Sequence, residues 1–151
     1  MFSNVLVVCV GNICRSPMAV AMLEQRLAAA EVRVRSAGIA ALTGSTMDTL
    51  AKAVLQSHRV PVSRHEARQV TRLLLREADL ILLMEHAHML KILALAPEVR
   101  GKTFLIGKWQ QPPEVADPYQ RPKSAFEQTY QHLSRCVDDW LPHLQSGEQD
   151  K

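Results

Sequence analysis

The chain has 151 residues, enough for one domain with a proper hydrophobic core, and its 47% hydrophobic content is normal for a globular protein. Its formal net charge of +3 is mild and its basic residues are scattered, which argues against nucleic acid as the main partner. Three cysteines do not make a disulfide framework. With no evident signal peptide and no stretch of membrane-spanning length, we expect a cytoplasmic protein without membrane insertion.

The first predicted element is a strand that begins at Val5 and leads directly into a loop. Its apolar, β-branched residues are typical of a buried parallel strand. Gly11 and Asn12 permit the backbone angles of a tight loop. We expect Ser16 to cap a helix in which Pro17 takes the first position. Strand, loop and helix start then gather backbone N–H groups around one point, and such a point attracts an anion.

Two side chains bound this loop, because Cys9 opens it and Arg15 closes it six positions later. A thiol in the field of the loop amides loses its proton easily and becomes a nucleophile. A guanidinium at the rim can bind two oxygens of a phosphate at once. The pair therefore predicts a phosphoryl-transfer site rather than a buried apolar cysteine beside a surface arginine.

The rest of the chain alternates helices with strands. Apolar periodicity predicts helices over 17–27, 47–58, 70–76, 86–96 and 123–144. Apolar or alternating runs predict further strands over 32–36, 80–84 and 103–106. Residues 107–122 hold four prolines without periodicity and predict a long loop, a type of segment that is often functional. We therefore expect one α/β domain over 1–145 with a parallel sheet, followed by a polar C-terminal tail over 146–151.

The chain resembles the low-molecular-weight protein tyrosine phosphatases, whose signature C-x5-R-[S/T]-P is matched by Cys9-Val10-Gly11-Asn12-Ile13-Cys14-Arg15-Ser16-Pro17. The family's acid-bearing D-P-Y loop is matched by Ala116-Asp117-Pro118-Tyr119. Two further segments fall where the family has similar residues, Ser36-Ala37-Gly38 and His65-Glu66-Ala67-Arg68-Gln69. The likeness covers nearly all of the chain. It implies a four-stranded parallel sheet flanked by helices on both faces, the phosphotyrosine phosphatase I-like fold.

The resemblance implies hydrolysis of protein phosphotyrosine without metal or cofactor, and it gives three residues a catalytic role. Cys9 is the expected nucleophile, which forms a phosphocysteine intermediate. Arg15 is expected to bind the phosphate and to stabilise charge on its oxygens in the transition state. Asp117 is the expected general acid, which protonates the leaving phenolate and then activates water. From the local sequence alone, an Asp-Pro pair is usually just a turn. Inorganic phosphate is the expected product.

The resemblance also implies a set of residues that bind phosphate or support the loop, namely Val10, Gly11, Asn12, Ile13, Cys14, Ser16, Ser36 and His65. In the family the polar members of this set hydrogen-bond behind the loop and hold its backbone. Ser16 can also stabilise the thiolate directly, in addition to its role as a helix cap.

Leu42 and Tyr119 are expected to form the rim through which substrate enters. Leu42 stands where eukaryotic members often carry an aromatic residue, and Gln120 stands where they have a second tyrosine. Both departures resemble the bacterial subgroup associated with tyrosine kinases of exopolysaccharide export. The expected substrate is therefore a tyrosine-phosphorylated protein, in particular a bacterial tyrosine kinase of exopolysaccharide or capsule production.

Several alternatives compete with this interpretation. Cys9 and Cys14 could suggest a metal site, but neither a second cysteine pair nor a fitting histidine cluster is present. In the family, a cysteine at the position of Cys14 can instead form a reversible disulfide that protects the nucleophile from irreversible oxidation. Arsenate reductase, the nearest rival enzyme, needs two further cysteines after the third strand, and residues 79–95 contain none. Related protein-arginine phosphatases carry threonine where this chain has Ile13, which favours phosphotyrosine. A phosphoprotein-binding module with an inactive site would need neither the thiol nor the acid.

Overall fold

A computed structural model describes residues 2–145 of the protein. Four parallel strands form the centre of the molecule. The strands are β1 (Asn4–Cys9), β2 (Arg33–Gly38), β3 (Leu80–Leu83) and β4 (Thr103–Leu105). They lie in the order β2-β1-β3-β4, and every neighbouring pair is parallel. The predicted four-stranded parallel sheet is confirmed.

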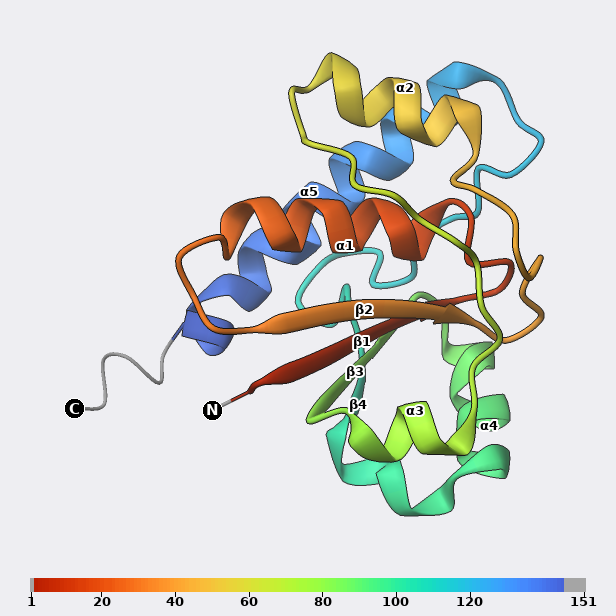
Figure 1. The fold of residues 1–151 in the computed structure, drawn as a ribbon, viewed down its shortest axis with the longest axis vertical. Helices are drawn as coiled ribbons and strands as arrows, with labels where there is room; N and C mark the ends of the chain where they lie inside the picture. The colour runs from red at the N-terminus through yellow and green to blue at the C-terminus, as the bar shows by residue number, and fades with distance from the viewer. Residues whose placement is uncertain (1, 146–151) are drawn as a thin grey trace.

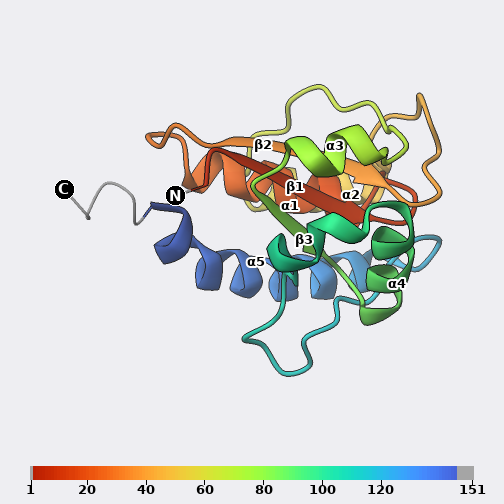
Figure 2. The ribbon, with the colours of Figure 1, turned by 90° about the horizontal axis from the view of Figure 1, so that it is seen from below.

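Helices cover both faces of this sheet, as Figures 1 and 2 show. The helices are α1 (Arg15–Arg26), α2 (Thr49–Ser57), α3 (Arg72–Glu77), α4 (His86–Leu95) and α5 (Lys123–Gln145), with a 3-10 helix η1 (Pro97–Lys102) before β4. In Figure 1, α1, α2 and α5 lie above the sheet, and α3 and α4 lie below it. No helix in the described part of the chain is both long and apolar enough to cross a membrane.

Strand β1 explains why the sheet needs two layers of helices. Val5 and Val7 pack into the core that includes residues of α1 and α5, whereas Leu6 and Val8 pack into the core that includes residues of α3 and α4. Because successive side chains of a strand point to opposite faces, a strand that is apolar throughout must be covered on both. The strand ends at Cys9, and the loop that follows lies at the carboxyl edge of the sheet, where parallel α/β sheets bind ligands.

The elements lie where the sequence predicts them, with shifts of a few residues at their ends. The predicted helix over 47–58 begins at Thr49, because the side chain of Asp48 accepts a hydrogen bond from the backbone of Leu50 and so caps it. The predicted helix over 70–76 begins at Arg72, with Thr71 as its cap. The predicted C-terminal tail over 146–151 lies outside the described residues.

Candidate active site

The loop between β1 and α1 contains one left-handed residue, as a tight loop predicts, but the start of α1 differs from its prediction. Asn12 adopts a left-handed backbone conformation with φ 61°, whereas Gly11 does not have a positive φ. The special backbone angle therefore falls on the asparagine, a residue type that tolerates this conformation better than most. The prediction that Ser16 caps the helix is wrong, because α1 begins at Arg15 with Cys14 at the cap position and no side-chain cap.

The segment that follows β2 supports this loop through its backbone. Ile39 donates to the carbonyl of Cys9 at 2.9 Å, and Leu42 donates to the carbonyl of Gly11 at 3.0 Å. The approach is closest at Gly38, where an added Cβ would lie 2.4 Å from the carbonyl oxygen of Val10. Only glycine fits there, which explains the glycine that follows Ser36 and Ala37.

Ser16 is buried, and its hydroxyl oxygen lies 2.9 Å from the sulfur of Cys9. The same oxygen accepts a hydrogen bond of 2.8 Å from the side-chain amide of Asn12. With that oxygen already accepting a hydrogen bond, the hydroxyl proton is available to the sulfur. Ser16 thus lies in the first turn of α1, where its hydroxyl contacts the sulfur of Cys9 and does not cap the helix.

Asn12 is held from behind by three residues, one at the end of β2 and two in the loop between α2 and α3. Its side-chain amide also donates to the hydroxyl of Ser36 at 2.9 Å, at the end of β2. Its side-chain oxygen accepts from the backbone of Arg68 at 2.9 Å, and its carbonyl oxygen lies 2.6 Å from Nε2 of His65. Sequence reasoning includes His65 and Ser36 in this support but misses Arg68, which lies in a segment without periodicity.

Arg15 is 1% exposed and is fixed by two acceptors. One terminal nitrogen, Nη1, lies 2.6 Å from the carboxylate of Glu85 and donates to the carbonyl of Val115 at 2.7 Å. Glu85 lies two residues after the end of β3, so the carboxyl ends of two neighbouring parallel strands meet here. From the sequence, a cation at the start of a helix needs a negative group nearby, because it opposes the helix dipole, but the sequence does not identify which residue this is. An acidic residue directly after the predicted strand at 80–84 is the signal that would have identified it.

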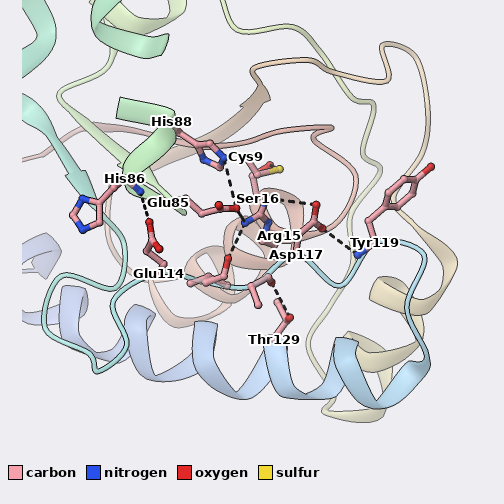
Figure 3. Close-up of polar contacts among 12 residues, drawn as sticks. Cys9, Arg15, Ser16, Glu85, His86, His88, Glu114, Asp117, Tyr119 and Thr129 are labelled. Atoms are coloured by element: carbon pink, nitrogen blue, oxygen red, sulfur yellow. Dashed lines mark hydrogen bonds and ion pairs between the residues drawn. The ribbon is translucent and has the colours of Figure 1, made fainter. Parts of the chain in front are cut away.

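Asp117 lies on the other side of Arg15, as Figure 3 shows. Its carboxylate is 3.6 Å from Nη2 of Arg15 and accepts a hydrogen bond of 3.1 Å from the backbone of Tyr119. The Asp117 side chain is 45% exposed. The loop is tied to α5 by the hydroxyl of Thr129, which donates to the carbonyl of Ala116 at 3.2 Å.

A cavity of about 150 Å³ lies between these groups. It is lined by Cys9, Val10, Gly11, Ile13, Cys14, Arg15, Ala40, Leu42, Asp117 and Tyr119. Leu42 and Tyr119 are exposed, which puts them at its mouth. The structure thus brings ten residues to one hollow, and nine of them, all but Ala40, follow from the sequence motifs of the loop, rim and acid. Asn12, Ser16, Ser36 and His65 do not line it and instead stand behind the loop.

The second cysteine of the loop differs chemically from the first. Cys14 is buried, and burial together with the nearby carboxylates of Asp48 and Asp117 holds the pKa of its thiol far above the ordinary range. Cys14 is therefore a neutral thiol at physiological pH and is unsuited to act as the nucleophile. The thiols of Cys9 and Cys14 are both free, and a disulfide between them stays a prediction.

A histidine lies behind Glu85. Nε2 of His88 is 3.6 Å from the carboxylate that holds Arg15, and His88 is buried. Burial lowers the pKa of His88, against the opposite effect of Glu85, so its imidazole is neutral at physiological pH. Glu114 accepts a hydrogen bond of 2.7 Å from the backbone of His86 and so fastens the acid-bearing loop to the start of α4.

Comparisons with known proteins agree with this geometry. Residues 4–150 match the family model of low molecular weight phosphotyrosine protein phosphatases. The low molecular weight protein-tyrosine-phosphatase Etp of Escherichia coli K12 is 43% identical over 143 residues, which cover 95% of each chain. Its counterpart Wzb of the same organism is 42% identical over 148 residues, which cover 98% of this chain and 99% of Wzb.

Solved structures give the same result. The tyrosine phosphatase AmsI of Erwinia amylovora superposes with a TM-score of 0.92 at 40% identity, over 96% of this chain and 95% of AmsI. The arginine phosphatase YwlE of Geobacillus stearothermophilus superposes with a TM-score of 0.90 at a lower identity of 31%, over 98% of this chain and 96% of YwlE. The fold, the site and both kinds of comparison agree, and the chain belongs to the low molecular weight phosphotyrosine protein phosphatase family.

Proposed function

We propose that the protein hydrolyses phosphotyrosine in proteins through a phosphocysteine intermediate on Cys9. The observation that carries the proposal is that one cavity is lined by a sulfur, a buried guanidinium and a carboxylate from distant parts of the chain. Cys9, Arg15 and Asp117 are the groups that nucleophilic attack, charge stabilisation and leaving-group protonation require.

In the first step the Cys9 thiolate attacks the phosphorus atom. The S–P bond forms as the bond from phosphorus to the phenolic oxygen breaks. Asp117, protonated at this stage, gives its proton to that oxygen, and tyrosine leaves neutral. The hydroxyl of Ser16, 2.9 Å from the sulfur, supports the thiolate form because a hydrogen bond to the charged form favours it.

In the second step water attacks the phosphocysteine. The Asp117 carboxylate takes a proton from the water as the new O–P bond forms and the S–P bond breaks. Inorganic phosphate leaves, and the Cys9 thiolate and the protonated Asp117 are restored. The same carboxyl group therefore serves as acid and then as base.

Throughout both steps the guanidinium of Arg15 and the loop amides face the phosphoryl oxygens. Arg15 is held by Glu85 and the carbonyl of Val115 before substrate arrives, so its fork needs little reorganisation. A preorganised positive group of this kind stabilises the charge that spreads over the oxygens in the transition state.

The cavity favours an aryl phosphate. Its small volume of about 150 Å³ suits a phosphate with a flat ring in the mouth, where Leu42 and Tyr119 offer apolar surface. Ile13, in the loop, favours phosphotyrosine over phosphoarginine. The bacterial relatives and the residues at Leu42 and Gln120 support a more specific proposal, that the physiological substrate is a cytoplasmic, tyrosine-phosphorylated kinase of exopolysaccharide or capsule production.

Turnover of p-nitrophenyl phosphate, followed by turnover of a phosphotyrosine peptide and a phosphoarginine peptide, tests the proposal. We expect the first two substrates to be hydrolysed and the third to be a poor substrate. Cys9→Ser abolishes turnover while phosphate still binds, whereas the control Cys136→Ala, which also removes a buried thiol, remains active. Unchanged turnover in Cys9→Ser, or a preference for phosphoarginine, would contradict the proposal.

A further inference from the structure

A second cavity, of about 260 Å³, lies beside the acid-bearing loop and the first half of α5. Asp117 lines this cavity as well as the catalytic one, so the two hollows share a wall. The second cavity plays no part in the chemistry of Cys9, because none of the phosphate-binding loop lines it.

Two guanidinium groups give this cavity a positive character. Arg121 and Arg135 both line it, and neither forms an ion pair with any residue in 2–145. Arg135 donates through Nε to the side-chain oxygen of Gln110 at 3.3 Å, a neutral acceptor. Among the described residues, some arginines have carboxylate partners, such as Arg26 with Asp138 at 3.0 Å, and others, such as Arg33 and Arg100, have none. The positive charge beside the acid loop is therefore not neutralised by an ion-pair partner.

An imidazole in the wall has an unused polar atom. Nε2 of His132 is buried and has no hydrogen-bond partner in the described chain. Buried polar atoms are normally paired with protein, water or ligand. Burial, and after it the charge of Arg135, lowers the pKa of this imidazole, against the opposite effect of a hydrogen bond to the backbone of Pro112. The ring is therefore neutral, and because its other nitrogen donates to Pro112, Nε2 can only accept a hydrogen bond. His132 does not itself bind an anion, so the positive character of the cavity comes from the two guanidinium groups.

A guanidinium pair in a polar hollow matches the chemistry of carboxylates and phosphates. The shared wall places such a group close to a phosphotyrosine bound over Cys9. One extended residue spans about 3.3–3.6 Å, so a neighbouring side chain of the same peptide can reach past Asp117.

We propose that this cavity is a subsite for a second acidic group of the substrate, a carboxylate or a second phosphate carried within a few residues of the phosphotyrosine. The proposal rests on the proposed function, since it extends the same substrate chain beyond the catalytic cavity. It makes Arg121 and Arg135 specificity-determining residues that do not touch the reacting atoms.

Three phosphotyrosine peptides that differ only at the flanking positions test the subsite, with glutamate, glutamine or phosphoserine there. We expect wild-type kcat/KM to be higher for the glutamate and phosphoserine peptides than for the glutamine peptide. Arg121→Ala and Arg135→Ala each lower kcat/KM for the acidic peptides by about two- to fivefold, the usual range for a solvent-exposed charge pair. A larger loss for phosphoserine than for glutamate identifies phosphate as the preferred group.

Two readouts separate this subsite from a structural role. Turnover of p-nitrophenyl phosphate and of the glutamine peptide stays at wild-type level in both variants, because neither substrate has a second acid. Arg100→Ala, which removes one exposed positive charge from η1, leaves all peptides unaffected and controls for net charge. Equal losses on the glutamate and glutamine peptides, or no loss on any, overturn the subsite. Failure of the wild-type protein to hydrolyse any phosphotyrosine peptide overturns the proposed function instead.

Discussion

The loop around Cys9 and the loop around Asp117 face the same cavity but are held in different ways. Asn12, Arg15 and Ser16 are buried; side-chain hydrogen bonds join Asn12 and Arg15 to distant parts of the chain and join Ser16 to Cys9 within the loop. Asp117 is 45% exposed, and its loop is held through the residues before it, Glu114, Val115 and Ala116. The proposed nucleophile and phosphate-binding loop are therefore held by buried hydrogen bonds, whereas the proposed acid is itself half exposed.

This difference suits the two tasks. A phosphate cradle gains from groups that are fixed before the substrate arrives, because reorganisation would reduce their stabilisation of the transition state. An acid that must serve first the leaving oxygen and then a water gains from access to both. Variants in the two loops should therefore fail in different ways.

Asp117→Asn should give a large loss that depends on the leaving group. The amide cannot donate a proton to the departing oxygen, so kcat for phenyl phosphate falls by about 10²–10⁴-fold, the usual range for general acid catalysis. The loss for p-nitrophenyl phosphate is smaller because its phenolate leaves more easily. Steady-state kinetics on both substrates measure the ratio. Asp138→Asn, which changes a surface partner of Arg26, is the control, and an equal loss on both substrates refutes the acid assignment.

Arg15→Lys should give a loss that does not depend on the leaving group. Lysine keeps the charge but loses the planar fork, so it cannot hold Glu85 and the carbonyl of Val115 while also presenting two N–H groups to phosphate. We expect kcat/KM to fall by about 10²–10³-fold for all aryl phosphates, as when one transition-state donor is removed. Arg26→Lys is the matched control on the same helix. Near-normal activity of Arg15→Lys would show that charge alone suffices.

The same two loops differ in how far the sequence predicts them. The apolar run to Cys9 and the pair Gly11-Asn12 predict a strand and a tight loop from local preferences alone. The start of α1 is mispredicted because the preference of serine for the cap position takes no account of tertiary contacts. In the structure the hydroxyl of Ser16 contacts the sulfur of Cys9 instead of capping the helix. Arg68 and Glu85 are missed because their partners lie about 50–70 residues away and no local pattern connects them.

The placement of Asp117 could not be predicted from local pattern. Residues 107–122 have no periodicity, and an Asp-Pro pair is common in turns. Only the family resemblance indicated that this aspartate approaches Arg15. No sequence pattern predicts the cavity lined by Arg121 and Arg135, because it forms where this loop packs against the surface of α5.

Stability measurements at Asn12 and Thr129 sharpen the contrast between the two loops. Asn12→Gly keeps the left-handed backbone but removes the side-chain hydrogen bonds, and should lower the free energy of unfolding by about 1–3 kcal/mol. Asn12→Ala adds the cost of a left-handed conformation, about 1–2 kcal/mol more. Thr129→Val removes one hydrogen bond to the acid loop and costs about 0.5–1.5 kcal/mol. Urea unfolding measures these free energies. If Thr129→Val lowers the free energy of unfolding as much as Asn12→Ala does, the two loops do not differ in how strongly they are held.

The smallest effect concerns His88, which lies behind Glu85. Four charged groups act on its imidazole: Glu85 and Glu114 raise its pKa, while Arg15 and Lys91 lower it, and burial lowers it most. Because the pKa is lower in the folded protein than its ordinary value of 6.5, the unfolded chain binds the proton more readily. The free energy of unfolding therefore falls as pH drops below that ordinary value.

His88→Gln should remove this dependence, so that the loss of stability between pH 7.5 and pH 5.5 is smaller in the variant than in the wild type. Urea unfolding at the two pH values measures the difference. His86→Gln, an exposed histidine on the same helix, is the control and should keep the wild-type dependence. If both variants behave alike, the acid sensitivity comes from elsewhere in the fold. If only His88→Gln differs, the buried imidazole of His88 is part of the charge balance around Glu85 and Arg15.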